Sequence, residues 1–360
     1  MMRCLLLTIT CCLILSGCER APEASQQMDN YLERVGRVLD ASWTRFDSQS
    51  LSQYRLPSRR DRLLPVAEQR IGMLELLVES RRCQTLQQSV SQRNSSLGKV
   101  MPWSHRLAAD GELIQALDEC IEVLHDDPSR EALLADLQNI AATKRDELPA
   151  VFWNALNASS EFEYYLRFAD GPLPVSSTAL TDQAALDALQ QLTAIGQALP
   201  SVLPPPRTEL QSHFQALQRS QRGSELIHSL ARLTHMLEQV TAMLGSERAQ
   251  KLCPLGKPTQ RSQILLNVFV TFYAGEIQPY LAQVQRLGQP WQQSLGELAQ
   301  VQAIPAETEH YLRALAGAEE SLWERYQQQL NAHSTAWQDV LGQCQLRPGQ
   351  PGWNNRDTDA

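Results

Sequence analysis

The chain has 360 residues, of which 43% are hydrophobic, and a formal net charge of −8 at pH 7. This length allows a large buried core and suits one large or two medium domains. A net acidic protein gains nothing overall from the negative charge of nucleic acid, so we expect no nucleic-acid partner.

The first residues have the layout of a bacterial lipoprotein signal. Arg3 precedes an apolar run over residues 4–15, which is in the range of a signal peptide and too short to span a bilayer. The run ends in Leu-Ser-Gly-Cys, the pattern in which the thiol of Cys18 accepts a diacylglycerol before the peptide bond in front of it is cut. We therefore predict a cleaved signal peptide over 1–17 and attachment to a membrane through the acyl chains on Cys18 alone.

The residues after the signal suggest a tether and a destination. The polar residues 18–27 are expected to form a short lipidated tether. Glu19 follows Cys18 in place of the Asp that most often signals retention in the inner membrane. The expected location is therefore the outer membrane of the cell envelope, facing the periplasm.

Four cysteines remain in the folded part of the chain, namely Cys83, Cys120, Cys253 and Cys344. An even number of cysteines in an exported chain indicates two disulfides, for which three connectivities are open. We favour the local pairs Cys83 with Cys120 and Cys253 with Cys344, because each pair then lies on one side of the Pro-rich stretches near residues 172 and 204. The alternative of metal binding lacks a Cys-x-x-Cys pair or a Cys/His cluster at ligand spacing.

Apolar residues recur at spacings of three and four along most of the chain, and sustained period-2 alternation is missing. This pattern predicts an all-α fold, a helical bundle of long amphipathic helices. In the first half, helices are expected at about 28–46, 60–92 and 110–125 and from Asp127 onwards, with Asp110 as the N-cap of the third. In the second half they are expected at about 182–199, 204–244, 261–287, 290–302 and 306–344. The helix over 204–244 is expected to bend at 220–224.

Gly and Pro residues over 169–182 mark the clearest break in the helical pattern. We therefore divide the chain into an N-terminal helical half, 28–170, a connecting loop, 171–181, and a C-terminal helical half, 182–346. These halves form either one bundle or two helical subdomains. The Pro, Gly, Asn and Asp residues of 347–360 predict a disordered tail.

The densest polar cluster between helices runs from Arg93 through Asn94, Ser95, Ser96 and Lys99 to Met101. Here the sequence resembles an uncharacterised proteobacterial lipoprotein family, catalogued as domain of unknown function 3080. The resemblance also rests on the lipobox and on three further segments: 31–34 (Tyr-Leu-Glu-Arg), 267–269 (Asn-Val-Phe) and 277–281 (Ile-Gln-Pro-Tyr-Leu). It covers most of the mature chain and implies an envelope lipoprotein, but it transfers no catalytic residue.

Ser96 and Lys99 also match the Ser-x-x-Lys spacing of penicillin-binding proteins and β-lactamases. In those enzymes a lysine one helical turn on deprotonates a serine nucleophile. The partner motifs Ser-Asp-Asn and Lys-Thr-Gly are absent from this sequence. The structural alternative is a polar corner between helices, in which Ser and Asn cap a helix and Gly98 takes a special backbone angle.

Two further groups of polar residues are candidates for a functional site. His235 and Glu238 lie three apart, with His228 two turns earlier, a spacing that allows metal ligation but is commoner in hydrogen-bonded bundle histidines. Residues 51–110 form a mainly basic segment and residues 111–170 a mainly acidic one. Either the two segments pair across a helix interface, or the basic cluster before residue 63 faces an anionic envelope polymer such as peptidoglycan or lipopolysaccharide. Its members are Arg55, Arg59, Arg60 and Arg62.

The sequence therefore predicts a non-enzymatic envelope lipoprotein without a cofactor or metal. Its helical body is expected to bind or scaffold another envelope protein or an anionic envelope polymer. The alternative is a hydrolase of cell-wall or lipid substrates, with Ser96 as nucleophile and Lys99 as base.

Overall fold

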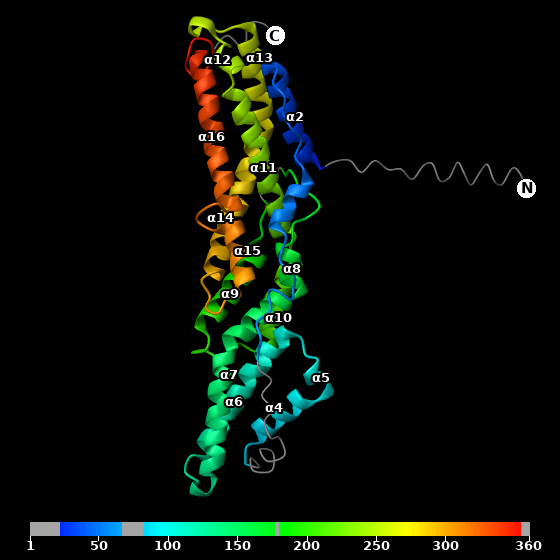
Figure 1. The fold of residues 1–360 in the computed structure, drawn as a ribbon, viewed down its shortest axis with the longest axis vertical. Helices are drawn as coiled ribbons and strands as arrows, with labels where there is room; N and C mark the ends of the chain where they lie inside the picture. The colour runs from blue at the N-terminus through cyan, green and yellow to red at the C-terminus, as the bar shows by residue number, and fades with distance from the viewer. Residues whose placement is uncertain (1–21, 67–81, 177–179, 354–360) are drawn as a thin grey trace, which may run out of the picture.

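The computed structural model describes residues 22–66, 82–176 and 180–353, and the structural statements below refer to this part of the chain. It contains helices and no strands, which confirms the all-α prediction (Figure 1). In chain order the helices are α2 (Glu23–Leu39), η1 (Ser48–Tyr54), α4 (Gln84–Asn94), α5 (Ser96–Lys99), α6 (Trp103–Leu124), η2 (Pro128–Arg130), α7 (Glu131–Ala158), α8 (Ser160–Leu166), α9 (Gln183–Ala198), α10 (Arg207–Gln218), α11 (Arg222–Leu244), α12 (Glu247–Gln250), η3 (Pro254–Gly256), α13 (Gln260–Val268), η4 (Phe269–Ile277), α14 (Gln278–Leu298), α15 (Ala306–Ala316) and α16 (Leu322–Gln343).

The molecule is an elongated rod with two regions (Figure 1). In the first, which we call the long bundle, α2 packs against α11, α13 and η4, while α11 packs against α16 and α14 against α9. In the second, which we call the limb, α6 and α7 form a hairpin at one end of the rod and α4 packs on α6. None of the described helices is long and apolar enough to cross a membrane.

Two hydrophobic clusters hold these regions together. The larger one takes buried residues from both predicted halves, from Ala24 to Leu346; it fills the long bundle and continues into the adjoining parts of α6 and α7. The smaller one fills the limb and comprises Cys83, Leu86, Val90, Leu113, Ala116, Leu117, Cys120, Leu124, Leu133, Leu137 and Ala141. The clusters therefore divide the chain differently from the expected boundary at 171–181.

The first two expected helices have different limits in the structure. Helix α2 begins at Glu23, inside the expected tether, and ends before Asp40. The left-handed backbone of Asp40 (φ 49°) turns the chain so that the N–H of Ala41 donates to the carbonyl of Gly36 over 2.9 Å. The helix expected over 60–92 is wrong at its start, because residues 60–66 form turns and coil. Of its remainder, 67–81 lie outside the described residues, and α4 begins only at Gln84.

Later helices differ from expectation mainly at Gly and Pro. The bend expected at 220–224 is a complete break, since α10 ends at Gln218 and α11 starts at Arg222. Helix α14 runs through Pro290 instead of starting there, and the helix expected at 306–344 is split by a loop over 317–321. Asp182 does precede α9, and Asp127 caps the turn that leads into α7, as predicted.

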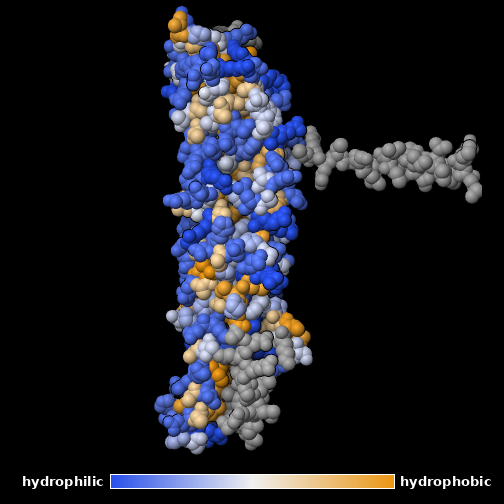
Figure 2. All heavy atoms as spheres, viewed as in Figure 1, coloured by the Kyte–Doolittle hydropathy of each residue, from blue (hydrophilic) through white to orange (hydrophobic). Residues whose placement is uncertain are grey.

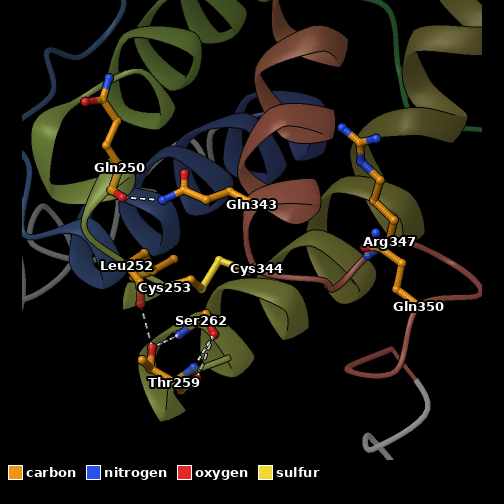
Figure 3. Close-up of a disulfide and its surroundings, with 9 residues drawn as sticks. All are labelled: Gln250, Leu252, Cys253, Thr259, Ser262, Gln343, Cys344, Arg347 and Gln350. Atoms are coloured by element: carbon orange, nitrogen blue, oxygen red, sulfur yellow. Dashed lines mark hydrogen bonds between the residues drawn. A yellow bond between two sulfur atoms is a disulfide. The ribbon is translucent and has the colours of Figure 1, made fainter. Parts of the chain in front are cut away.

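Both predicted disulfides are present. Cys83–Cys120 joins the start of α4 to α6 in the limb, and Cys253–Cys344 joins the segment after α12 to the end of α16. Figure 3 shows the second bond with Thr259, whose hydroxyl donates to the carbonyl of Leu252 over 2.9 Å. The bonds thus lie towards opposite ends of the rod (Figure 1).

The first part of the expected disordered tail is ordered. Arg347 donates from Nε to the carbonyl of Gln338 over 2.8 Å, and its own N–H donates to the side chain of Gln350. Gly352 is buried, and Trp353 packs against the larger cluster. Residues 354–360 lie outside the described part of the chain.

Candidate functional site

The largest hollow described on the molecule is an open groove of about 1060 Å³ between α2 and α11–α12. We call it the α2–α11 groove. Its apolar part contains Trp43, which lies so close to Gly36 that a Cβ on this glycine would be 2.9 Å from the indole. The groove is lined by Glu33, Gly36, Arg37, Asp40, Ala41, Ser42, Trp43, Gln239, Ala242, Met243, Ser246, Glu247 and Arg248.

The charged residues of the groove are of both signs and are arranged in pairs. Arg37 pairs with Glu33 on α2, and Arg248 lies 2.8 Å from Asp40 across the groove. The hydrogen bond from Arg248, together with its charge, lowers the pKa of Asp40. Glu247 adds a third carboxylate, which pairs with Lys251 over 3.0 Å, so each carboxylate of the groove has a basic partner.

His235 fixes the wall of the groove. The spacing of His235 and His228 in the sequence would allow metal ligation. The ring of His235 binds the backbone carbonyl of Thr44 over 2.9 Å, and the N–H of Thr44 donates to Gln239 over 3.1 Å. His228 is buried and binds the carbonyl of Ala169 over 2.9 Å. Both histidines thus position backbone, and the described residues contain no group of three His, Cys, Asp or Glu side chains placed to hold a metal.

A second hollow, of about 630 Å³, lies where α9 and α11 begin. Asp182 accepts hydrogen bonds there from Tyr165 over 2.8 Å and from Ser220 over 2.6 Å. Burial raises the pKa of this carboxyl group. Because its two oxygens are occupied by hydroxyl donors, Asp182 holds α8, α9 and α10 together.

The predicted polar segment 93–101 forms the end of α4 and the single turn of α5. Ser95, rather than Ser96, is the cap: its Oγ accepts from the N–H of Gly98 over 3.0 Å and donates to the carbonyl of Gln92 over 2.7 Å. Ser96 is exposed and lines none of the three hollows described. Asn94 donates to the carbonyl of Val90 within its own helix.

Gly98 is required by close packing rather than by an unusual backbone angle. A Cβ at this position would lie 2.3 Å from the carbonyl oxygen of Arg93 and 2.5 Å from that of Gln92. Distances this short exclude any side chain without movement of the backbone. The segment is therefore a tight corner, and the expected special angle at Gly98 is replaced by a steric reason.

Arg93 ties this corner to a buried charge cluster that the sequence analysis missed. It pairs with Asp110, which is only 1% exposed and also lies 3.7 Å from Arg106. Lys144 and Glu147, 2.5 Å apart and both largely buried, complete the cluster from α7. Burial raises the pKa of Asp110, while the nearby cations oppose this shift.

The position of Asp110 corrects the prediction that it caps a helix. Helix α6 already begins at Trp103, directly after Pro102, so Asp110 lies two turns inside it. The i, i+4 spacing of Arg106 and Asp110 was the available signal for the pair. Nothing in the sequence indicated that the pair would be buried.

Arg62 differs from the other three members of the basic cluster because it is buried. Its side chain is 1% exposed and donates to the carbonyls of Pro57 and Asn157, each over 2.8 Å, and to Glu163 over 3.3 Å. Arg55, Arg59 and Arg60 are exposed. Two ion pairs, Arg62–Glu163 and Arg82–Asp127, join the basic and acidic segments, in agreement with the pairing alternative.

A buried aromatic cluster lies in the long bundle beside the π-helix η4. Trp337 donates to the hydroxyl of Tyr31 over 2.7 Å, and Tyr31 lies 2.9 Å from Nε2 of His333. The N–H of Trp337 also lies 3.2 Å from Nε2 of His333. Nδ1 has no partner among the described residues, and burial lowers the pKa of His333 to about 3.

The cluster is a closely packed part of the core. The ring of Tyr273, from η4, lies 4.7 Å from that of His333, measured between centroids. π-Helical turns are frequent at functional sites, but none of the hollows described reaches these rings. Among the features described here, the α2–α11 groove therefore offers the best surface for another molecule.

These features define the class of the protein: an elongated all-α bundle with a disulfide-tied limb at one end and a second disulfide near the other. Residues 28–348 match the family described as protein of unknown function (DUF3080). This match covers most of the chain, so the protein belongs to that family. No curated protein and no solved structure matches the chain.

Proposed function

We propose that this protein is a lipid-anchored envelope lipoprotein of the outer membrane, facing the periplasm, that acts by binding another envelope protein. The anchor is supported by the lipobox ending in Cys18, which lies outside the described residues. The observation that carries the binding function is the α2–α11 groove, which combines an open hollow of about 1060 Å³ with Trp43 and paired charges of both signs. Aromatic and arginine side chains are the residues on which protein interfaces most depend.

The charges of the groove favour a protein partner over an anionic polymer. A polymer such as lipopolysaccharide would meet the carboxylates of Glu33, Asp40 and Glu247, and the basic residues beside them are already paired with these carboxylates. A protein surface can offer charges of both signs in matching positions. We therefore place the partner in the class of proteins.

The hydrolase alternative has less support. A serine nucleophile requires a pocket, an adjacent base and donors for the oxyanion. Ser96 is exposed on a single helical turn, and the neighbouring Ser95 makes the hydrogen bonds that hold this turn. The arrangement is typical of a surface corner.

Photo-crosslinking in intact cells tests the binding function. Ala242 is exposed and lines the groove, whereas Thr335 is also exposed, on α16, and does not line it. A photoreactive residue at 242 is expected to give one discrete crosslinked protein, which disappears when Trp43→Ala is added. A photoreactive residue at position 335 should give no crosslinked protein. Absence of the product at 242, or the same product at both positions, would contradict the proposal.

A further inference from the structure

Helix α5 presents two large apolar side chains to solvent. Leu97 is 82% exposed and Val100 is 77% exposed, one turn apart, and Met101 and Trp103 beside them are half-buried. Figure 2 shows hydrophobic atoms at the position of α5, on an edge of the rod that is otherwise mostly hydrophilic. We call residues 96–103 the α5 tip.

The tip is held firmly, so its exposure belongs to the fold. The cap by Ser95 and the close packing of Gly98 on the carbonyls of α4 fix the single turn. Arg93 anchors the preceding residues to the buried Asp110. At the far side of the tip, the guanidinium of Arg106 stacks on Trp103 at 4.6 Å.

The charges around the tip are mostly paired. Residues 82–109 contain Arg82, Arg93, Lys99 and Arg106 and no Asp or Glu, but Arg93 and Arg106 pair with Asp110, and Arg82 pairs with Asp127. A contact at the tip therefore depends on its exposed apolar side chains and the tryptophan beside them, which are residue types of a membrane interface.

The described chain also starts on the same edge of the rod. In Figure 1, the beginning of α2 and the α5 tip both form the right-hand edge of the molecule. Pro22 is only four residues after Cys18, and four residues of fully extended chain span at most about 14 Å. An acylated Cys18 would therefore keep the start of α2 close to the bilayer surface, and the α5 tip lies on the same edge of the rod.

From this placement we propose that the α5 tip contacts the lipid bilayer that holds Cys18, with Leu97 and Val100 inserted at the interface. The proposal rests on the lipid anchor of the proposed function. It makes the tip a second contact that orients the rod along the membrane. One acyl anchor alone would leave the rod free to rotate.

Depth-dependent fluorescence quenching tests this contact. The acylated full-length protein, with a fluorophore on Ser96→Cys, is reconstituted into vesicles of phosphatidylethanolamine and phosphatidylglycerol that carry spin-labelled lipids. We expect the fluorophore to be quenched at a depth of about 5 Å below the headgroups. The control carries the fluorophore on Leu255→Cys, which is 95% exposed between α12 and α13 at the opposite end of the rod, and it should remain unquenched.

A matched pair of substitutions separates insertion from mere proximity. Leu97→Asn and Val100→Asn change two exposed side chains, so the fold should be retained, and quenching at Ser96→Cys should fall to the level of the control. Equal quenching at both labelled positions in the parent protein would overturn the contact.

Mass spectrometry of the same sample shows separately whether Cys18 is acylated. An unacylated chain would contradict the proposed function and this contact together. An acylated chain without quenching would contradict the contact alone.

Discussion

The long bundle and the limb are stabilised in different ways. The bundle buries most of the large side chains, including Trp153, Trp291 and Trp337, in one continuous cluster. The limb has a separate core of eleven small and medium residues, supplemented by a disulfide and by the charge cluster around Asp110. A region with little apolar surface to bury depends on covalent and ionic restraints, and the predictions below test this dependence.

Removal of each disulfide should give the largest difference between the two regions. The loops closed are 37 and 91 residues, for which chain entropy predicts stabilisation of about 4 and about 5 kcal/mol. The pair Cys83→Ser and Cys120→Ser should open the limb locally, because its core is small. The pair Cys253→Ser and Cys344→Ser should lower the melting temperature without selective opening.

Hydrogen exchange of α4 and α6 distinguishes these two outcomes. In the variant without the limb disulfide, exchange should increase in α4 and in the half of α6 around Cys120, while α11 and α16 stay protected. Equal protection of the limb with and without its disulfide would contradict the account.

Asp110→Asn should be the next largest effect, about 3 kcal/mol of lost stability. The substitution keeps the shape of the side chain but leaves Arg93 and Arg106, about one fifth exposed, without their carboxylate. Asp118→Asn is the matched control, because Asp118 also pairs with an arginine but is 41% exposed. Asp118→Asn should lower the free energy of unfolding by less than about 1 kcal/mol. Similar unfolding free energies for the two variants would show that burial of Asp110 does not matter.

The bundle should show a pH dependence that originates from His333. Because burial lowers its pKa in the folded state to about 3, protonation below pH 6.5 occurs in the unfolded chain first. Stability is then lost as the pH falls, by about 1.4 kcal/mol per pH unit from this one group. His333→Phe should flatten the curve by that amount relative to the parent protein. Since His228 is unchanged in both proteins, the difference between their denaturation curves isolates His333, and parallel curves would contradict the assignment.

The smallest effects concern the corner at α5. Gly98→Val should cost about 1 to 3 kcal/mol, because the new side chain meets two backbone carbonyls. Ser95→Ala should cost about 1 kcal/mol through loss of the cap. Ser96→Ala should stay within about 0.5 kcal/mol, since its side chain is exposed. A greater loss of stability from Ser96→Ala than from Ser95→Ala in thermal denaturation would reverse the assignment of the cap.

Local patterns in the sequence were sufficient for the helices and the disulfides. Apolar spacing identifies helices such as α9, with Asp182 before it and Pro200 after it, and the position of the Pro-rich stretches favours the two pairs that the structure contains. Helix ends were less predictable where tertiary contacts determine them. Asp40 ends α2 in a left-handed conformation, and no Gly or Pro marks that point.

The residues of the candidate site could not be predicted in the same way. The α2–α11 groove combines Trp43 with Arg248, about 200 positions apart, and single-sequence periodicity carries no information on such contacts. The same holds for Arg62 with Asn157 and for Tyr31 with His333. Charge alone suggested that Arg62 faces solvent, whereas three acceptors around its guanidinium make burial favourable.

The central claim is that a protein of this class is fixed to a membrane by Cys18 and acts from there by binding. Mass spectrometry of the N-terminal peptide of the protein purified from cell envelopes tests it most directly. The account predicts a mature chain that begins at Cys18 and carries acyl groups, and a Cys18→Ser variant that remains unprocessed or leaves the membrane fraction. A parent chain that begins at another residue, or that begins at Cys18 without acyl groups, would contradict it.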